Sequence, residues 1–250
     1  AVSAFALQSL PGEFSMALRQ AVAEQISDRN ADYVAELGQN LNFNYNRQKR
    51  HERLRVGYVS PDFRFHSVSV AFKGILDNHC TDKIEAYGYA LHSGGDDHMT
   101  DALRERFHGF HKLVDNSFQD SARLIHDDGI DILIDLAGHT KGGQLSLLAL
   151  RPAPIQAHYL GYSATIGARF LDYLITDHHQ VPPEQRPFFT ENLVYLPDTF
   201  MATQRAPIAV DGPSRAECGL PDDAFGPSQH RLAEAENMAG MRLVGFALIP

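Results

Sequence analysis

Asp131-Ile132-Leu133-Ile134-Asp135-Leu136 is the clearest strand in this sequence and decides its fold class. Its aliphatic residues form a short apolar run, as expected for a strand buried in a sheet. The glycine-bearing loop 138–143 follows it, and a helix is expected to begin near Leu145. A strand, a tight turn and a helix in this order predict a βαβ unit.

The same alternation extends outward in both directions. Runs rich in β-branched and aromatic residues predict further strands at 54–59, 85–91, 111–114, 155–160, 173–176 and 193–196. Helical periodicity between them predicts helices at 70–76, 98–107 and 119–126. This spacing predicts an α/β, Rossmann-like fold: a mostly parallel sheet with helices on both faces.

The two ends of the chain differ from this pattern. Residues 1–45 are expected to be helical, with the clearest apolar spacing at 15–26. After about Pro213 the sequence becomes irregular, with a short helix expected at 231–241 and a strand at 244–249.

The composition excludes several classes of protein. A net charge of −9 argues against nucleic acid as a partner. No apolar stretch approaches the ~20 residues of a membrane helix, so no membrane partner is expected. The two cysteines form no CxxC pair, which favours a reducing, cytoplasmic location over a disulfide scaffold.

Ligands of parallel sheets bind beyond the carboxyl ends of the strands, which directs attention to loops 60–66, 138–143 and 161–167. The loop 138–143 brings backbone N–H groups to a helix start, where an anion is favoured. It matches neither the Walker A nor the GxGxxG spacing, so a plain strand-to-helix turn stays an alternative. The loop 161–167 has two interpretations: a sugar packs on its backbone, or it is a simple tight turn.

Several side chains in these loops are suited to acid–base chemistry. His66 lies just past the first strand, and histidine titrates near neutrality, although a plain surface histidine is an alternative. Asp131 and Asp135 lie four residues apart on one strand and would face the same side, as an acid–base pair of a hydrolase would.

No metal site is expected. The chain contains no HExxH and no Asp-x-Asp motif, and its closely spaced histidines lack a cysteine pair. Those histidines are His108, His111, His178 and His179.

Taken together, the segments resemble the catalytic region of the family of O-GlcNAc transferases and plant SPINDLY proteins. The most specific stretch is Leu150-Arg151-Pro152-Ala153-Pro154-Ile155-Gln156 followed by Leu160-Gly161-Tyr162. The other matching stretches are 54–63, 126–136, 138–142 and 172–177, and the resemblance covers about residues 50–225.

The resemblance implies the N-terminal lobe of a two-lobed GT-B glycosyltransferase. Such an enzyme moves GlcNAc from UDP-GlcNAc to Ser or Thr hydroxyls of proteins, with inversion and without a metal or other cofactor. Its partners are therefore a sugar nucleotide and a protein or peptide acceptor. His66 falls at the family's catalytic histidine; Thr140, Leu160, Gly161 and Tyr162 fall at donor-binding positions; Asp135, His139 and Lys141 are further candidates.

The resemblance also implies a domain organisation. Residues 1–50 are expected to form a helical connector after tetratricopeptide repeats, 51–212 the N-terminal catalytic lobe, and 213–250 the entry to the C-terminal lobe. The match ends after Phe225, so we expect the 250 residues alone to be inactive as an enzyme. Ser163, Ala164 and Ile166 replace the family's usual residues. A non-catalytic remnant and a protein O-fucosyltransferase of the SPINDLY type stay as alternatives.

Overall fold

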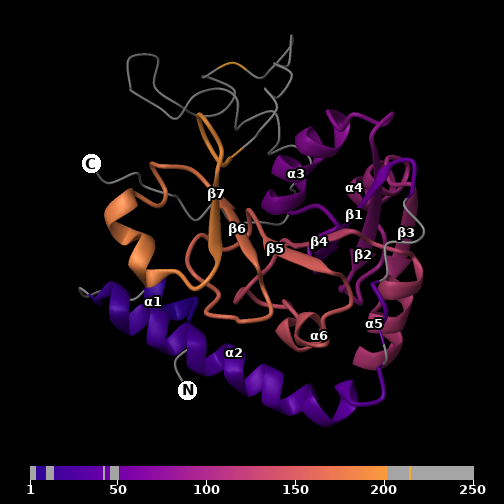
Figure 1. The fold of residues 1–250 in the computed structure, drawn as a ribbon. Helices are drawn as coiled ribbons and strands as arrows, with labels where there is room; N and C mark the ends of the chain where they lie inside the picture. Colours follow the sequence, from indigo (N-terminus) through magenta and orange to yellow (C-terminus); the bar gives the residue numbers. More distant parts are fainter. Residues whose placement is uncertain (1–3, 10–13, 42, 46–50, 202–213, 215–250) are drawn as a thin grey trace. The chain divides into compact units, whose positions relative to one another are not determined.

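The fold is a single parallel sheet with helices on both faces (Figure 1). The computed structural model describes residues 4–9, 14–41, 43–45, 51–201 and 214. The strands are β1 Leu54–Ser60, β2 Ile84–Ala90, β3 Gly109–Lys112, β4 Ile132–Asp135, β5 Ile155–His158, β6 Tyr173–Thr176 and β7 Asn192–Tyr195. The helices are α1 Ala6–Ser9, α2 Met16–Gly38, α3 Ser67–Asp77, α4 His98–Arg104, α5 Phe118–Asp127 and α6 Leu145–Ala149, with a 3-10 helix η1 at Pro183–Phe188.

The predicted α/β class is confirmed, and every predicted strand in the described range is present, with ends shifted by a few residues. The helical prediction for the N-terminal segment is confirmed at Ala6–Ser9 and Met16–Gly38, which takes in residues 16–26 of the stretch with the clearest apolar spacing. Residues 39–41 and 43–45 follow α2 without helical structure, as the asparagine-rich run that begins at Leu41 favours. The helix at 231–241 and the strand at 244–249 lie outside the described residues.

The sheet order β3-β2-β1-β4-β5-β6-β7 places β1 and β4 side by side at its centre. All neighbouring pairs are parallel, and Val59 of β1 is in register with Asp135 of β4. The chain runs outward from β1 through β2 to β3, and then from β4 to β7. The β1–β4 boundary is therefore the topological switch point, where open α/β sheets bind ligands.

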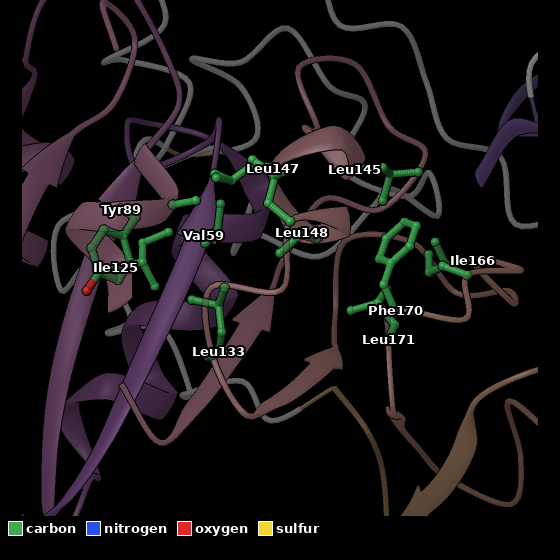
Figure 2. Close-up of a cluster of buried hydrophobic side chains, with 14 of the residues drawn as sticks. Val59, Tyr89, Ile125, Leu133, Leu145, Leu147, Leu148, Ile166, Phe170 and Leu171 are labelled. Carbon is green, nitrogen blue, oxygen red and sulfur yellow. The ribbon is translucent and has the colours of Figure 1, made fainter. Parts of the chain in front are cut away.

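Each face of the sheet has its own apolar core because alternate strand residues point to opposite faces. Figure 2 shows the larger cluster, in which Val59 and Leu133 of the sheet meet Ile125 of α5 and Leu148 of α6. The aromatic rings of Tyr58, Phe63, Phe72 and Phe107 dominate the other cluster, on the α3 and α4 side. In the view of Figure 1, α2 and α6 lie below the sheet and α3 lies above it.

The long helix α2 is stabilised by an N-terminal cap and by a tertiary hydrogen bond. Ser15 caps its start by accepting a hydrogen bond from the Leu18 amide at 3.2 Å. The hydroxyl of the buried Ser27 donates to the Ile166 carbonyl at 2.7 Å, so the helix is bound to the loop after β5. Among the described residues, none of the helices is long and apolar enough to cross a membrane.

Leu133→Ala tests the central core. Leu133 is fully buried, so we expect the substitution to lower the free energy of unfolding by about 2–5 kcal/mol, measured by urea denaturation. Leu18→Ala is the matched control because Leu18 is 44% exposed on α2, and it should change the free energy by less than about 0.5 kcal/mol. Equal effects of the two substitutions would contradict the assignment of Leu133 to the core.

Candidate functional site

The three loops singled out from the sequence contact one another at the carboxyl edge of the sheet. A Cβ atom added at Gly142, in the loop after β4, would lie 2.8 Å from the Cβ of Pro61 in the loop after β1. A Cβ atom added at Gly161, after β5, would lie only 1.9 Å from the Leu136 carbonyl oxygen. The loops are therefore packed so closely that only glycine fits at Gly161, and together they form one continuous surface.

His66 caps the amino end of α3 beside the switch point. Its Nδ1 accepts a hydrogen bond from the Val68 amide at 3.3 Å. In the neutral ring the proton is therefore assigned to Nε2, for which none of the described residues supplies an acceptor. With 37% of its side chain exposed, His66 combines a fixed ring with an accessible N–H group.

Asp62, in the loop after β1, lies close to His66. Its Oδ2 lies 3.5 Å from the His66 Nδ1, and its backbone N–H donates to the Ser60 hydroxyl at 3.0 Å. Burial raises the pKa of Asp62, while the nearby His66, Arg64 and His92 side chains oppose that rise. A carboxyl group with a raised pKa at the switch point is a candidate for proton transfer.

Asp135 is the final residue of β4 and forms a buried pair with His158 of β5. The Asp135 Oδ2 lies 2.8 Å from the His158 Nδ1, and the His158 Nε2 lies 2.7 Å from the Tyr162 carbonyl oxygen. Both ring nitrogens face acceptors, so the imidazole is in its protonated form. Burial alone lowers the pKa of His158, but the Asp135 carboxylate outweighs it and the net shift is upward.

Asp135 also accepts hydrogen bonds from the amides of Ala137, at 3.2 Å, and Gly138, at 2.6 Å. Its carboxylate thus positions the backbone of this loop as well as the His158 ring. Asp131 precedes β4 at the opposite end of the strand, where it accepts from the Arg55 amide at 2.9 Å. The two aspartates have separate partners at opposite ends, so the hydrolase-type acid–base pair considered from the sequence is wrong.

In the loop after β4, His139 turns inward and Lys141 outward. The His139 Nε2 lies 2.9 Å from the Ile166 carbonyl oxygen, and burial lowers the pKa of its ring. The Thr140 hydroxyl donates to the Ala137 carbonyl at 2.7 Å, which leaves its oxygen able to accept a further hydrogen bond. Lys141 is exposed.

The loop after β5 starts with a strained turn. Leu160 has a φ of +73°, a left-handed conformation that side chains other than glycine rarely adopt. Strain of this kind persists where the surrounding structure imposes it and is common at ligand sites. Tyr162 is only 5% exposed, and burial raises the pKa of its hydroxyl to about 12. The Tyr162 ring therefore anchors the loop in the protein interior, and the backbone of Leu160 and Gly161 forms the turn.

The predicted site residues thus fall into two groups, and the members of each group are joined by contacts. His66 lies at the β1 loop with Asp62, and the other candidates lie on the loops after β4 and β5, joined through Asp135 and His158. Sequence reasoning missed Asp62 and His158. Two features of the sequence could have indicated them. Asp62 lies two residues beyond β1, and His158 is, with Gln156, a polar residue in an otherwise apolar strand. Among the described residues, no cluster of three or more potential metal ligands occurs.

The Asp135–His158 pair predicts a defined pH dependence. Because the folded pKa of His158 is raised above its unfolded value near 6.5, its contribution to stability is complete below about pH 6.5 and is lost as the pH rises through the folded value. The difference in unfolding free energy between the wild type and His158→Gln should therefore shrink above pH 6.5, by at most ~1.4 kcal/mol per pH unit. Urea denaturation across this range measures it, and a pH-independent difference would rule out the charged pair.

Comparison with solved structures supports the arrangement of the sheet and loops. A mutant of the Thermobaculum terrenum O-GlcNAc transferase superimposes with a TM-score of 0.66 and 29% sequence identity. The match covers 79% of this chain and 37% of that protein.

Curated relatives match the same region. A probable UDP-N-acetylglucosamine–peptide N-acetylglucosaminyltransferase, SEC of Arabidopsis thaliana, is 34% identical over 180 residues, covering 70% of this chain and 18% of the relative. The UDP-N-acetylglucosamine–peptide N-acetylglucosaminyltransferase of Caenorhabditis elegans is 40% identical over 158 residues, covering 62% and 14%. The chain thus spans less than a fifth of the length of these relatives.

The family profile described as Glycosyl transferase family 41 matches residues 7–209. This chain belongs to glycosyl transferase family 41.

Proposed function

We propose that the protein carrying this chain transfers GlcNAc from UDP-GlcNAc to Ser or Thr hydroxyls of proteins, with inversion at the anomeric carbon. In this proposal, residues 51–212 supply the N-terminal lobe of a GT-B enzyme, and residues 213–250 lead to the second lobe. The relatives whose names carry this activity support the proposal. Tetratricopeptide repeats upstream, a cytoplasmic location and the lack of a resident metal or other cofactor are parts of the same proposal.

The observation that carries the proposal is the position of His66. It caps α3 at the β1–β4 switch point, where the partial positive charge of the helix start favours an anion. Its Nε2–H is available to donate to a phosphate oxygen of the departing UDP. Stabilising this leaving group is the main electrostatic task in sugar transfer from a nucleotide donor.

The remaining loop residues have complementary roles. The Lys141 ammonium and the Thr140 hydroxyl, on the loop after β4, are placed for the polar part of the donor. The backbone of Leu160 and Gly161 forms a surface on which a sugar ring packs, held in place by the close approach to Leu136. The acceptor oxygen forms its bond to the anomeric carbon as the bond to the phosphate oxygen breaks, and Asp62 is the candidate to take the hydroxyl proton.

His66→Ala tests the assignment in the full-length protein that carries this chain. Loss of the donor to the leaving group should lower kcat at least ~100-fold, measured by transfer of radiolabelled GlcNAc to a Ser-containing peptide. The melting temperature should fall by only a few degrees, because the substitution removes the hydrogen bond that caps α3 but little buried surface. His108→Ala, which removes another exposed histidine at 47% side-chain exposure, is the matched control and should retain full activity.

Near-normal transfer by His66→Ala would remove His66 from the site. A parallel reaction with GDP-fucose tests the alternative taken from the SPINDLY resemblance: transfer of fucose in place of GlcNAc would replace the proposed donor. Binding of both nucleotides without transfer to any peptide would favour the non-catalytic lobe.

A further inference from the structure

His92 lies directly beside Asp62 at the same edge of the sheet. Ser60 of β1 is in register with Ala90 of β2, and the Leu91 amide continues the pairing by donating to the Ser60 carbonyl at 2.9 Å. His92 and Asp62 each lie two residues beyond the Ser60–Ala90 pair. They therefore occupy equivalent positions just beyond the ends of two adjacent strands, and Asp62 lies in the loop that leads to His66.

The His92 ring is buried without a partner. The residue is 8% exposed, and neither Nδ1 nor Nε2 forms a hydrogen bond with any other described residue. Leaving a buried polar group unsatisfied destabilises a fold, so such groups are rare, and a ligand that binds to them is one explanation for their presence. The buried His158 and the partly buried His139 differ: His158 bonds to Asp135 and Tyr162, and the His139 Nε2 lies 2.9 Å from the Ile166 carbonyl oxygen.

The chemistry of the two neighbouring side chains specifies which group satisfies both of them. Asp62 is close enough for its charge to interact with His92, yet no hydrogen bond or ion pair joins the two side chains. A neutral imidazole offers one donor and one acceptor, whereas a carboxylate only accepts. A hydroxyl group satisfies both side chains at once, because it donates to the carboxylate and accepts from the imidazole N–H.

We propose that His92 binds a substrate hydroxyl group between its imidazole and the Asp62 carboxylate. The inference rests on the proposed sugar transfer and adds a second histidine to that site. Two hydroxyl sources share this chemistry, a hydroxyl of the donor sugar and the Ser or Thr hydroxyl of the acceptor. His92 is a substrate-binding residue in either case.

The test compares His92→Leu with the wild-type full-length protein. Leucine fills a similar volume and removes both unsatisfied nitrogens, so the melting temperature without ligand should stay unchanged or rise. The kcat/KM for sugar transfer should fall about tenfold or more. His92→Gln keeps one donor and one acceptor and should recover part of this loss.

His79→Leu is the matched control. The His79 Nε2 lies 2.7 Å from the hydroxyl of the buried Tyr58, so this substitution leaves that hydroxyl unpaired. It should lower the melting temperature by about 2–6 °C while kcat/KM in the folded protein is kept. A ligand role and a structural role of a histidine thus give opposite patterns of stability and activity.

UDP-GlcNAc, UDP and two matched peptides identify the hydroxyl. If it belongs to the sugar, His92→Leu loses the thermal stabilisation that UDP-GlcNAc adds beyond UDP. If it belongs to the acceptor, both nucleotide shifts are kept, and the variant binds a Ser peptide no better than the same peptide with Ala in place of Ser.

Three results would overturn the inference. One is a melting temperature of His92→Leu several degrees below that of the wild type, as for His79→Leu. Another is a kcat/KM of His92→Leu equal to that of the wild type, in an assay in which the wild-type protein transfers sugar. A wild-type protein that transfers no sugar would refute the proposed function itself, and the role of His92 would fall with it.

Discussion

The buried ion pair between Asp135 and His158 is the interaction on which the carboxyl edge of the sheet depends. It joins the ends of two central strands, and the second ring nitrogen of His158 extends it to the Tyr162 carbonyl. Removing one member of such a pair leaves a buried charge uncompensated, which typically costs about 3–5 kcal/mol. The pair therefore fixes the loops after β4 and β5 relative to each other, and with them the candidate donor side of the site.

The loop after β5 is held from other directions as well. The buried Glu191 accepts from the Ile166 amide at 2.7 Å and from the Thr165 hydroxyl at 2.8 Å, while Ser27 of α2 donates to the Ile166 carbonyl. The far end of the loop is thus held by three hydrogen bonds, while the close approach of Gly161 to the Leu136 carbonyl holds its start beside the left-handed Leu160. Such support on both sides is what a preorganised ligand site requires.

Much of the fold follows from local sequence patterns, but the site does so only in part. The segment 131–136 predicts a buried strand because it is an apolar run between turns, and His66 was found from its place after a strand. The helix was expected through the far end of α2, but the apolar spacing is clear only at 15–26; residues 27–38 include many polar side chains, and tertiary contacts such as the Ser27 hydrogen bond hold them in place. The approach of Asp62 to His66 within 3.5 Å, and the equivalent positions of Asp62 and His92, depend on chain geometry and on the register of β1 and β2, which a single sequence does not reveal.

The most direct test of this account is a crystal structure of the full-length protein with UDP-GlcNAc bound. The central claim is that the donor binds where the loops after β1, β4 and β5 meet. The account predicts the diphosphate at the amino end of α3, within hydrogen-bonding distance of the His66 Nε2, and the sugar ring against the backbone of Leu160 and Gly161. A donor bound in a way that contacts none of the three loops would contradict it.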